Sequence, residues 1–267
     1  MTYRSKDEIN RLVEDLMDRE SPIYDFVSED GISHIVWIVN DVDAIQRLME
    51  LFHGIDSLYI ADGHHRSASA VKVGLKRRRE NPDYSGSEEF NFFLSVLFPD
   101  DQLHIMDYNR VVKDLNGYST EDFLKKIGEK FEVEFYNGEE SYSPKKKHSF
   151  GMYLEDKWYI LNAREGTFNQ EDPVERLDVS ILQKNILEPI LGICDPRTDN
   201  RIDFIGGIRG LKELERRVST DMKVAFSMYP TSIEDLMTIA DEGKIMPPKS
   251  TWFEPKLRSG LFIHKLS

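Results

Sequence analysis

Acidic and basic residues surround one glycine in the run Asp62-Gly63-His64-His65-Arg66. Gly63 can take a left-handed backbone conformation and lets another group approach the chain closely. Arg66 can bind a phosphate or a carboxylate through two parallel hydrogen bonds. His64, His65 and Asp62 can transfer protons or hold a metal ion. The run therefore predicts an anion-binding site that also carries acid–base groups.

The elements on either side of this run would position it. The apolar segment 58–61 predicts a strand, and residues 67–79 predict a helix. The amides of a helix's first turn have no partners within the helix and favour an anion. A simpler interpretation is that Asp62 caps the helix and that the histidines face solvent. Since a cap needs only one of these residues, we favour the binding site.

A second segment, 246–251, places two prolines before three side-chain donors. The prolines stiffen the backbone, and Lys249, Ser250 and Thr251 then suit a phosphate or a carboxylate. The alternative is that the prolines end the preceding turn and that Lys249 faces water. The sequence leaves both interpretations open.

Composition restricts the class of protein. The 267 residues, of which 40% are hydrophobic and 31% charged, indicate an ordered globular chain of one large or two small domains. A formal net charge of −13 argues against broad binding to nucleic acids or anionic membranes. The single cysteine, Cys194, excludes a disulfide framework and a cysteine-based zinc site. No apolar run reaches the length of a membrane span and the first residues do not form a signal peptide, so we expect a cytoplasmic protein.

Helical and strand-like patterns are mixed along the chain, which predicts an α+β fold with largely antiparallel sheets and packed helices. We expect one compact unit with two lobes. Residues 1–115 would carry the Asp62–Arg66 run, and residues 116–267 would return Lys249–Thr251 to the same site. Predicted helices cover 6–19, 41–52, 67–79, 120–130, 179–191 and 233–240. Predicted strands cover 23–27, 33–39, 58–61, 92–98, 104–112, 131–136, 149–154, 158–162 and 223–228.

Several other charged segments have simple structural interpretations. The basic run 145–148 is typical of a solvated hairpin edge. Arg110 is predicted to be a structural ion-pair partner, Asp178 a helix N-cap, and the glycine-rich segment 206–210 a hinge or tight turn. The remaining histidines lack paired ligand spacing, so we expect no structural metal site. A Mg²⁺ ion held by Asp62 and shared with phosphates stays open.

The motifs, taken in order, resemble the bacterial and archaeal domain-of-unknown-function family 1015. Its signature is the Ala-Asp-Gly-His-His-Arg run, present here as residues 61–66. The other matching segments are 22–26, 178–182, 230–232, 246–251, 255–257 and 259–261. Family members resemble one another over a further N-terminal region with a Pro-Pro-Tyr-Asp segment. The sequence therefore looks like a C-terminal fragment or a naturally shortened member, and a homo-oligomer or a partner that supplies the absent region stays open.

The Asp62–Arg66 run is also similar to the phosphate-binding motif of the ParB and sulfiredoxin superfamily, which includes free serine kinases that use ADP or ATP. This resemblance implies that Gly63, His64, His65 and Arg66 bind nucleotide phosphates, with Asp62 as a contact for metal or substrate. A family association with serine biosynthesis implies serine or phosphoserine as substrate.

Together these patterns predict an enzyme that binds a small phosphorylated ligand and performs phosphoryl transfer or phosphate-ester hydrolysis. Arg66, the helix amides and Lys249 would neutralise charge, and His64 or His65 would act as general acid–base or nucleophile. Mg²⁺ and a nucleotide are the cofactors that this hypothesis allows. The alternative is a non-catalytic nucleotide or phosphometabolite sensor, and DNA binding of the ParB type is disfavoured by the acidic charge.

Overall fold

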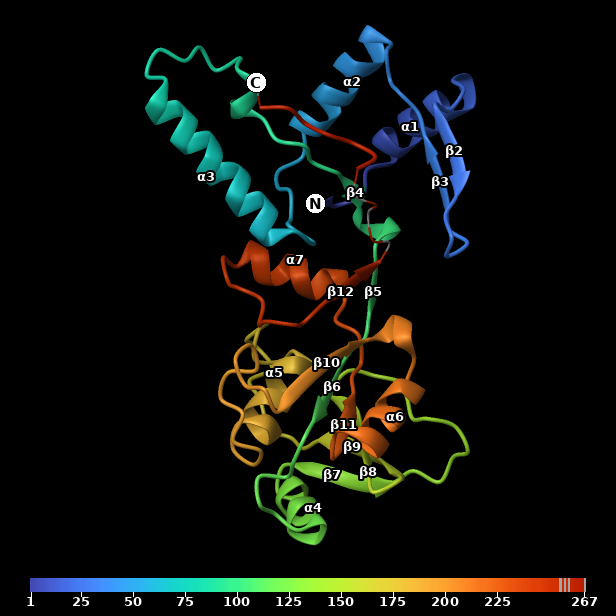
Figure 1. The fold of residues 1–267 in the computed structure, drawn as a ribbon, viewed down its shortest axis with the longest axis vertical. Coiled ribbons are helices and arrows are strands. Elements are labelled where there is room, and N and C mark those ends of the chain that lie inside the picture. The colour runs from blue at the N-terminus through green and yellow to red at the C-terminus, as the bar shows by residue number, and fades with distance from the viewer. Residues whose placement is uncertain (255, 257, 259, 267) are drawn as a thin grey trace. The chain divides into compact units, whose positions relative to one another are not determined.

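The computed structural model describes residues 1–254, 256, 258 and 260–266, so the matching segments 255–257 and 259–261 lie partly outside the described residues. The chain has an α+β fold with mostly antiparallel sheets, as predicted. It divides into two compact units (Figure 1). The first unit contains Met1–Leu103 and Leu257–Ser267, and the second contains His104–Lys256.

Helices and two small sheets make up the first unit. Its elements are β1 (Thr2–Tyr3), α1 (Asp7–Arg19), β2 (Tyr24–Val27), β3 (Ser33–Val36), α2 (Val42–His53), α3 (His64–Glu80), η1 (Glu89–Asn91), β4 (Phe98–Pro99) and η2 (Asp100–Gln102). Strands β2 and β3, which lie within the predicted strands 23–27 and 33–39, form an antiparallel hairpin, while β1 pairs with β4 in parallel. Asp41 caps α2, because its carboxylate accepts hydrogen bonds from the amides of Asp43 and Ala44 at 2.9 and 3.3 Å.

Two strand predictions in the first unit are wrong. In the segment 58–61, only Tyr59 pairs with another strand, through two hydrogen bonds of 2.8 Å with Thr2. In the segment 92–98, only Phe98 belongs to a strand, and Phe92 and Phe93 are exposed. A short apolar run becomes a strand only where a partner edge is available, and its own sequence does not contain that information.

The second unit is built on a six-stranded antiparallel sheet with the strand order β10-β6-β11-β8-β9-β7. The strands of this unit are β5 (His104–Met106), β6 (Tyr108–Val112), β7 (Phe131–Phe135), β8 (Ser149–Leu154), β9 (Lys157–Ala163), β10 (Ile202–Gly206), β11 (Val224–Ser227) and β12 (Trp252–Glu254), of which β5 and β12 pair separately. Its helices are α4 (Thr120–Gly128), α5 (Asp178–Leu182), the π-helical η3 (Gln183–Leu187), the 3₁₀ turn η4 (Gly207–Arg209), α6 (Lys212–Thr220) and α7 (Ile233–Asp241).

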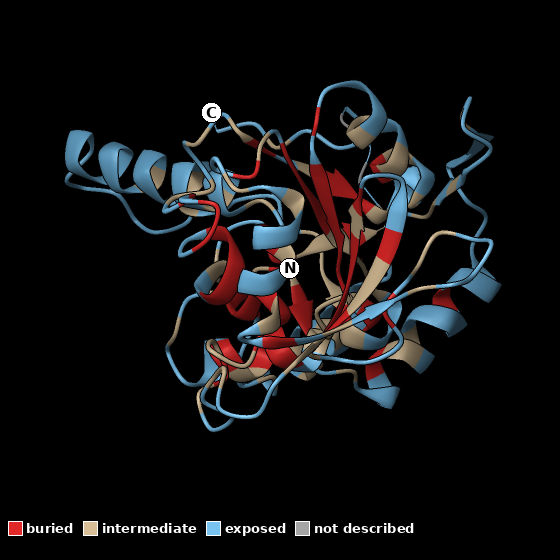
Figure 2. Ribbon diagram, turned by 90° about the horizontal axis from the view of Figure 1, so that it is seen from below, coloured by how far each residue is buried: buried red, intermediate tan, exposed pale blue. Residues whose placement is uncertain are grey.

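Both faces of the large sheet are buried, and Figure 2 shows the buried residues in red along its strands. Val112 on β6 belongs to the core cluster that contains Phe123 of α4 and Ile181 of α5. Its neighbour Val111 belongs to a second cluster with Leu214 of α6. Because side chains alternate along a strand, Arg110 lies on the same face as Val112, which is the face covered by α5.

The helix predicted over 179–191 is shorter and less regular than expected. Helix α5 ends at Leu182, and a π-helical turn follows. The Asn185 side chain donates to the carbonyls of Ile181 and Thr167 at 2.9 and 3.2 Å. Pro189 has no backbone N–H with which to continue an α-helix. Side-chain competition and the proline together explain the early end of the helix.

Candidate functional site

Gly63 forms the N-terminal boundary of α3, and its φ of 82° lies in the left-handed region. The first helical hydrogen bond runs from the Ser67 amide to the Gly63 carbonyl at 2.9 Å. The amides of His64, His65 and Arg66 therefore precede the hydrogen-bonded part of the helix, and Gly63 at the cap position has no side chain to bond them. Their N–H groups and the helix dipole favour an anion at this end of α3.

Asp62 does not form the helix cap of the simpler interpretation. Its Oδ1 accepts from the Gly63 amide at 2.7 Å, one residue before the helix begins. A capping carboxylate would instead accept from the second or third amide of the helix.

Arg66 turns back over the glycine. A Cβ atom at Gly63 would lie 3.1 Å from both Nε and Nη2 of Arg66. The side chains of His64, His65 and Arg66 are all exposed. This arrangement places a guanidinium and two imidazole-bearing residues beside uncapped amides, which is chemically suited to a small anion.

Lys249 lies in the second unit, in a left-handed conformation with a φ of 59°. Its ammonium is 5.6 Å from the centre of the Phe204 ring and 5.8 Å from that of Tyr108. The buried Ser250 donates its hydroxyl to the Pro247 carbonyl at 2.6 Å, and Thr251 is half-buried. The two segments that were predicted to share a site, Asp62–Arg66 and Lys249–Thr251, thus belong to different units. That they form one site stays a prediction.

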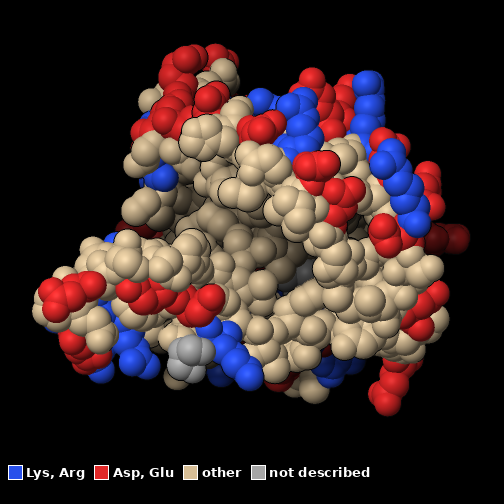
Figure 3. Space-filling model, turned by 90° about the horizontal axis from the view of Figure 1, so that it is seen from above, with Lys and Arg blue, Asp and Glu red and all other residues tan. Residues whose placement is uncertain are grey.

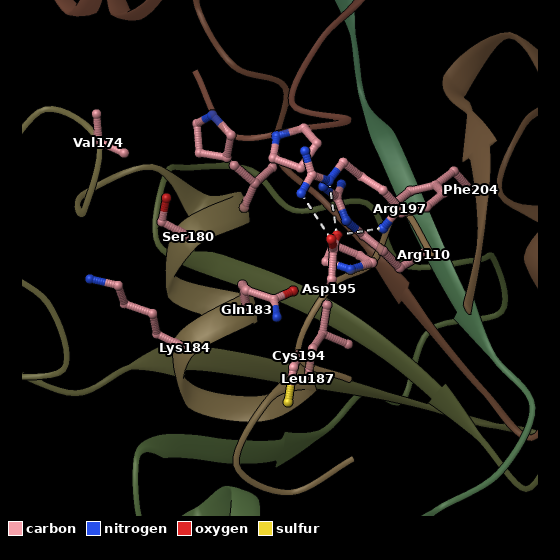
Figure 4. A pocket seen from close by; sticks show the side chains of 14 residues that line it. Arg110, Val174, Ser180, Gln183, Lys184, Leu187, Cys194, Asp195, Arg197 and Phe204 are labelled. Atoms are coloured by element: carbon pink, nitrogen blue, oxygen red, sulfur yellow. Dashed lines mark hydrogen bonds and ion pairs between the residues drawn. The ribbon is translucent and has the colours of Figure 1, made fainter. Parts of the chain in front are cut away.

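A cavity of about 490 Å³ in the second unit lies beside α5 (Figure 4). Arg110, which is only 3% exposed, lines it and donates to the carbonyls of Tyr108 and Lys249, the latter at 2.8 Å. Among the described residues, no carboxylate forms the predicted ion pair with Arg110. Burial lowers the pKa of Arg110 to about 10, so it remains cationic at neutral pH. The nearby Arg197 is bound through two nitrogens to Asp195, as the dashed lines in Figure 4 show.

The prediction that Asp178 is a helix N-cap is wrong, because it is the first residue of α5 and Leu177 occupies the cap position. The Oδ1 of Asp178 accepts a hydrogen bond from the His148 amide at 2.9 Å. Its Oδ2 is buried and has no hydrogen-bond partner among the described residues. Burial raises the pKa of Asp178 to about 7.

The basic run 145–148 is not a purely solvated edge. Lys147 forms an ion pair of 2.6 Å with Asp235, whose side chain is only 9% exposed. His148 has a φ of 65°, and its Nε2 lies 3.1 Å from the Arg176 carbonyl. Burial lowers the pKa of His148. Sequence reasoning missed this cluster because its members come from three separate segments with no shared spacing.

No group of three or more histidine, cysteine, aspartate or glutamate side chains within the described part of the chain is arranged to hold a metal ion. Mg²⁺ binding through Asp62 and phosphates therefore stays a prediction. On the face shown in Figure 3, uncharged residues fill the middle, and acidic and basic side chains lie mostly around the edge. Among the described helices, none combines the length and apolar character needed to cross a bilayer.

The chain is an α+β protein. Gly63, in a left-handed backbone conformation, immediately precedes α3 and has no side chain to cap this helix. The family model described as "Protein of unknown function (DUF1015)" matches residues 1–180, and the chain belongs to this family. The comparison with curated proteins found no match.

Among solved structures, the chain is similar to a free serine kinase in complex with AMP, with 15% identity and a TM-score of 0.39 over 94% of this chain and 81% of the other. A free serine kinase variant in complex with ADP gives 14% identity and a TM-score of 0.39 over 94% and 82% of the two chains. A conserved hypothetical protein from Pyrococcus furiosus is 14% identical to this chain, with a TM-score of 0.39 over 94% of this chain and 85% of the other. Likeness at this level establishes neither a shared fold nor a shared activity.

Proposed function

We propose that this protein binds the phosphate group of a small metabolite at Gly63–Arg66 and acts on it by phosphoryl transfer or phosphate-ester hydrolysis. The observation that carries the proposal is the left-handed Gly63 at the uncapped start of α3, with the Arg66 guanidinium over it. Backbone amides and a guanidinium that are fixed before the ligand arrives bind phosphate oxygens at little cost in reorganisation. The similarity of the run to the phosphate-binding motif of the ParB and sulfiredoxin superfamily also supports it.

In this proposal each side chain of the run has a distinct role. Arg66 and the amides of the first turn neutralise the phosphate oxygens. His64 or His65 serves as general acid–base or as nucleophile, and Asp62 contacts Mg²⁺ or the substrate. Lys249 and Thr251 add the second wall. The Ser250 hydroxyl already donates to Pro247, so Ser250 contributes an acceptor oxygen or its backbone.

Serine and phosphoserine are the proposed substrates, with a nucleotide and Mg²⁺ as cofactors. The test is turnover by the purified protein, followed by ³¹P NMR, of phosphoserine alone and of serine with ADP or ATP and Mg²⁺. We expect wild-type turnover and its loss in the Arg66→Ala, His65→Ala double variant. Arg79→Ala is the control, because Arg79 lies in the last turn of the same helix. Equal turnover in the wild type and the double variant would refute the catalytic assignment.

A non-catalytic sensor of phosphorylated metabolites is the second candidate. The exposure of His64, His65 and Arg66 favours it, because phosphoryl transfer needs a site from which water is excluded. A sensor would be stabilised against heat by ADP or phosphoserine without any turnover. The same Arg66→Ala variant would lose that stabilisation.

A further inference from the structure

The cavity of about 490 Å³ beside α5 has mainly apolar walls. The apolar lining comes from separate segments of the second unit and includes Val174, Val179, Leu187, Phe204, Pro247 and Pro248. Cavities of about 300–1,000 Å³ with such walls typically hold a small organic molecule, which a few polar groups orient. None of the residues Asp62–Arg66 lines this cavity, so a ligand bound here does not depend on the proposed function.

Arg110 brings a buried positive charge to the wall of this cavity. Its guanidinium donates to the carbonyl oxygens of Tyr108 and Lys249, and it lies 5.5 Å from the centre of the Phe204 ring. These contacts fix its position, but a carbonyl oxygen carries no net charge with which to balance the cation. A buried charge without an opposite charge is costly, because it has lost its hydration. A bound anion would compensate for that loss.

Arg110 also keeps hydrogen-bond donors for a ligand. A guanidinium has five N–H donors, and the described residues accept from only two of them. Its Nε has no acceptor among these residues. This nitrogen is not fully buried, since Asp178 Oδ2 is the only fully buried side-chain nitrogen or oxygen without a partner among the described residues that are not exposed. Because Arg110 lines the cavity, a ligand there can accept from it.

No carboxylate of the described chain forms an ion pair with Arg110. Asp178 acts on it electrostatically, but binds the His148 amide instead. Burial also raises the pKa of Asp178 to about 7, so that part of this carboxyl is uncharged at neutral pH. The carboxylate of Asp195, which lines the cavity, is held by two nitrogens of Arg197. An anionic ligand would therefore supply the charge that these side chains do not.

The other basic residue of the lining, Lys184, is already paired. Its ammonium lies 2.7 Å from the Glu175 carboxylate. Figure 4 shows Arg110 and Phe204 on one side of the cavity and Val174 and Lys184 on the other. A ligand whose anionic group meets Arg110 would thus extend the rest of its body along the apolar walls.

The charge of the ligand follows from this arrangement. A phosphomonoester carries about −1.5 to −2 charges at neutral pH, which is more than one guanidinium balances, whereas a carboxylate carries a single charge. A guanidinium can also bind a carboxylate through two parallel hydrogen bonds. We infer that this cavity binds an organic carboxylate with an aromatic or branched aliphatic body, with its carboxylate on Arg110 and its body against the apolar walls.

The test is isothermal titration of the whole protein with 3-phenylpropanoate and 4-methylpentanoate, and with 3-phenylpropanamide and acetate as comparison ligands. We expect at least one of the two larger carboxylates to bind. The amide has the shape without the charge, and acetate has the charge without the apolar body. Each is therefore expected to bind at least tenfold more weakly, which corresponds to about 1.4 kcal/mol.

Arg110→Met removes the charge and keeps an apolar chain, so it is expected to weaken carboxylate binding at least tenfold. Arg201→Met is the matched control, because Arg201 also donates to two carbonyl oxygens, those of Leu191 and Gly192, and does not line the cavity. It should leave the affinity unchanged. Circular dichroism checks the fold of both variants.

Cys194 provides a second measurement that needs no variant. It is the only cysteine of the sequence, is exposed and lines the cavity. A saturating carboxylate is expected to slow its alkylation by N-ethylmaleimide severalfold. If Arg110→Met does not fold, this rate and the comparison ligands decide the question. The inference is overturned if neither larger carboxylate binds, if the amide or acetate binds as tightly, if folded Arg110→Met keeps wild-type affinity, or if the alkylation rate is unchanged.

Discussion

The guanidinium of Arg66 and the backbone of Gly63 lie so close that a methyl group on Gly63 would come within 3.1 Å of Nε and Nη2. The glycine is needed there for two separate reasons. Its φ of 82° is costly for other residues, and its missing side chain leaves room for Arg66. Gly63 thus determines both where α3 begins and where the Arg66 guanidinium lies.

Gly63→Ala is expected to lower the free energy of unfolding by about 1–2 kcal/mol and to weaken phosphate binding at least tenfold, because it displaces Arg66. Urea denaturation measures the first effect, and titration with inorganic phosphate measures the second. Gly86→Ala is the matched control, since Gly86 has a φ of 98° and open space around its Cα. It should lose similar stability and keep its phosphate affinity. Unchanged phosphate affinity in Gly63→Ala would contradict the role of this contact.

Asp178 should make the protein less stable as the pH rises from about 4 to 8. Its pKa is raised by burial from the ordinary value of 3.8 to about 7 in the folded state. Between these values the folded state binds more protons than the unfolded state, so the free energy of unfolding falls with increasing pH. One pKa unit corresponds to about 1.36 kcal/mol, which sets an upper limit of about 4 kcal/mol.

Urea denaturation of the wild type and Asp178→Asn at a series of pH values measures this effect. The stability of the variant relative to the wild type is expected to increase over the same range. Asp195→Asn should show no such trend, since the pKa of Asp195 is lowered to about 2 by its hydrogen bonds from Arg197. A parallel pH dependence of the wild type and Asp178→Asn would show that Asp178 titrates normally.

Lys147→Met is expected to destabilise the protein by about 1–3 kcal/mol. The substitution would leave the largely buried Asp235 carboxylate without its cation. Although burial opposes ionisation, the hydrogen bonds from Lys147 and Ser232 hold the pKa of Asp235 below its usual value. Thermal denaturation at neutral pH measures the loss. Lys126→Met, which removes an exposed pair with Glu129, should change stability much less than Lys147→Met, and an equal effect of both variants would contradict the assignment.

Local signals in the sequence were sufficient for much of the fold. The helices predicted over 41–52 and 120–130 are present as α2 and α4, and β8 has the predicted bounds. These features depend on residues close together in the chain. The failed strand at 58–61 depends on whether a distant edge is available, and a single sequence does not supply this.

The candidate functional residues show the same difference between local and long-range information. The turn at Gly63 could be predicted from the sequence, because its residues are contiguous and their physical roles do not depend on the rest of the fold. The cluster of Lys147, Asp178 and Asp235 could not be predicted from the sequence, because these residues are brought together only by the packing of β8, α5 and α7. A buried carboxylate at a helix start has the same sequence pattern as an ordinary cap.

Titration calorimetry with phosphoserine and ADP measures directly whether Gly63–Arg66 binds phosphate. We predict that the wild type and Arg79→Ala bind at least one of these ligands with equal affinity, and that Arg66→Ala binds it at least tenfold more weakly. Equal binding by Arg66→Ala and the wild type, or no binding of either ligand by the wild type, would contradict the claim.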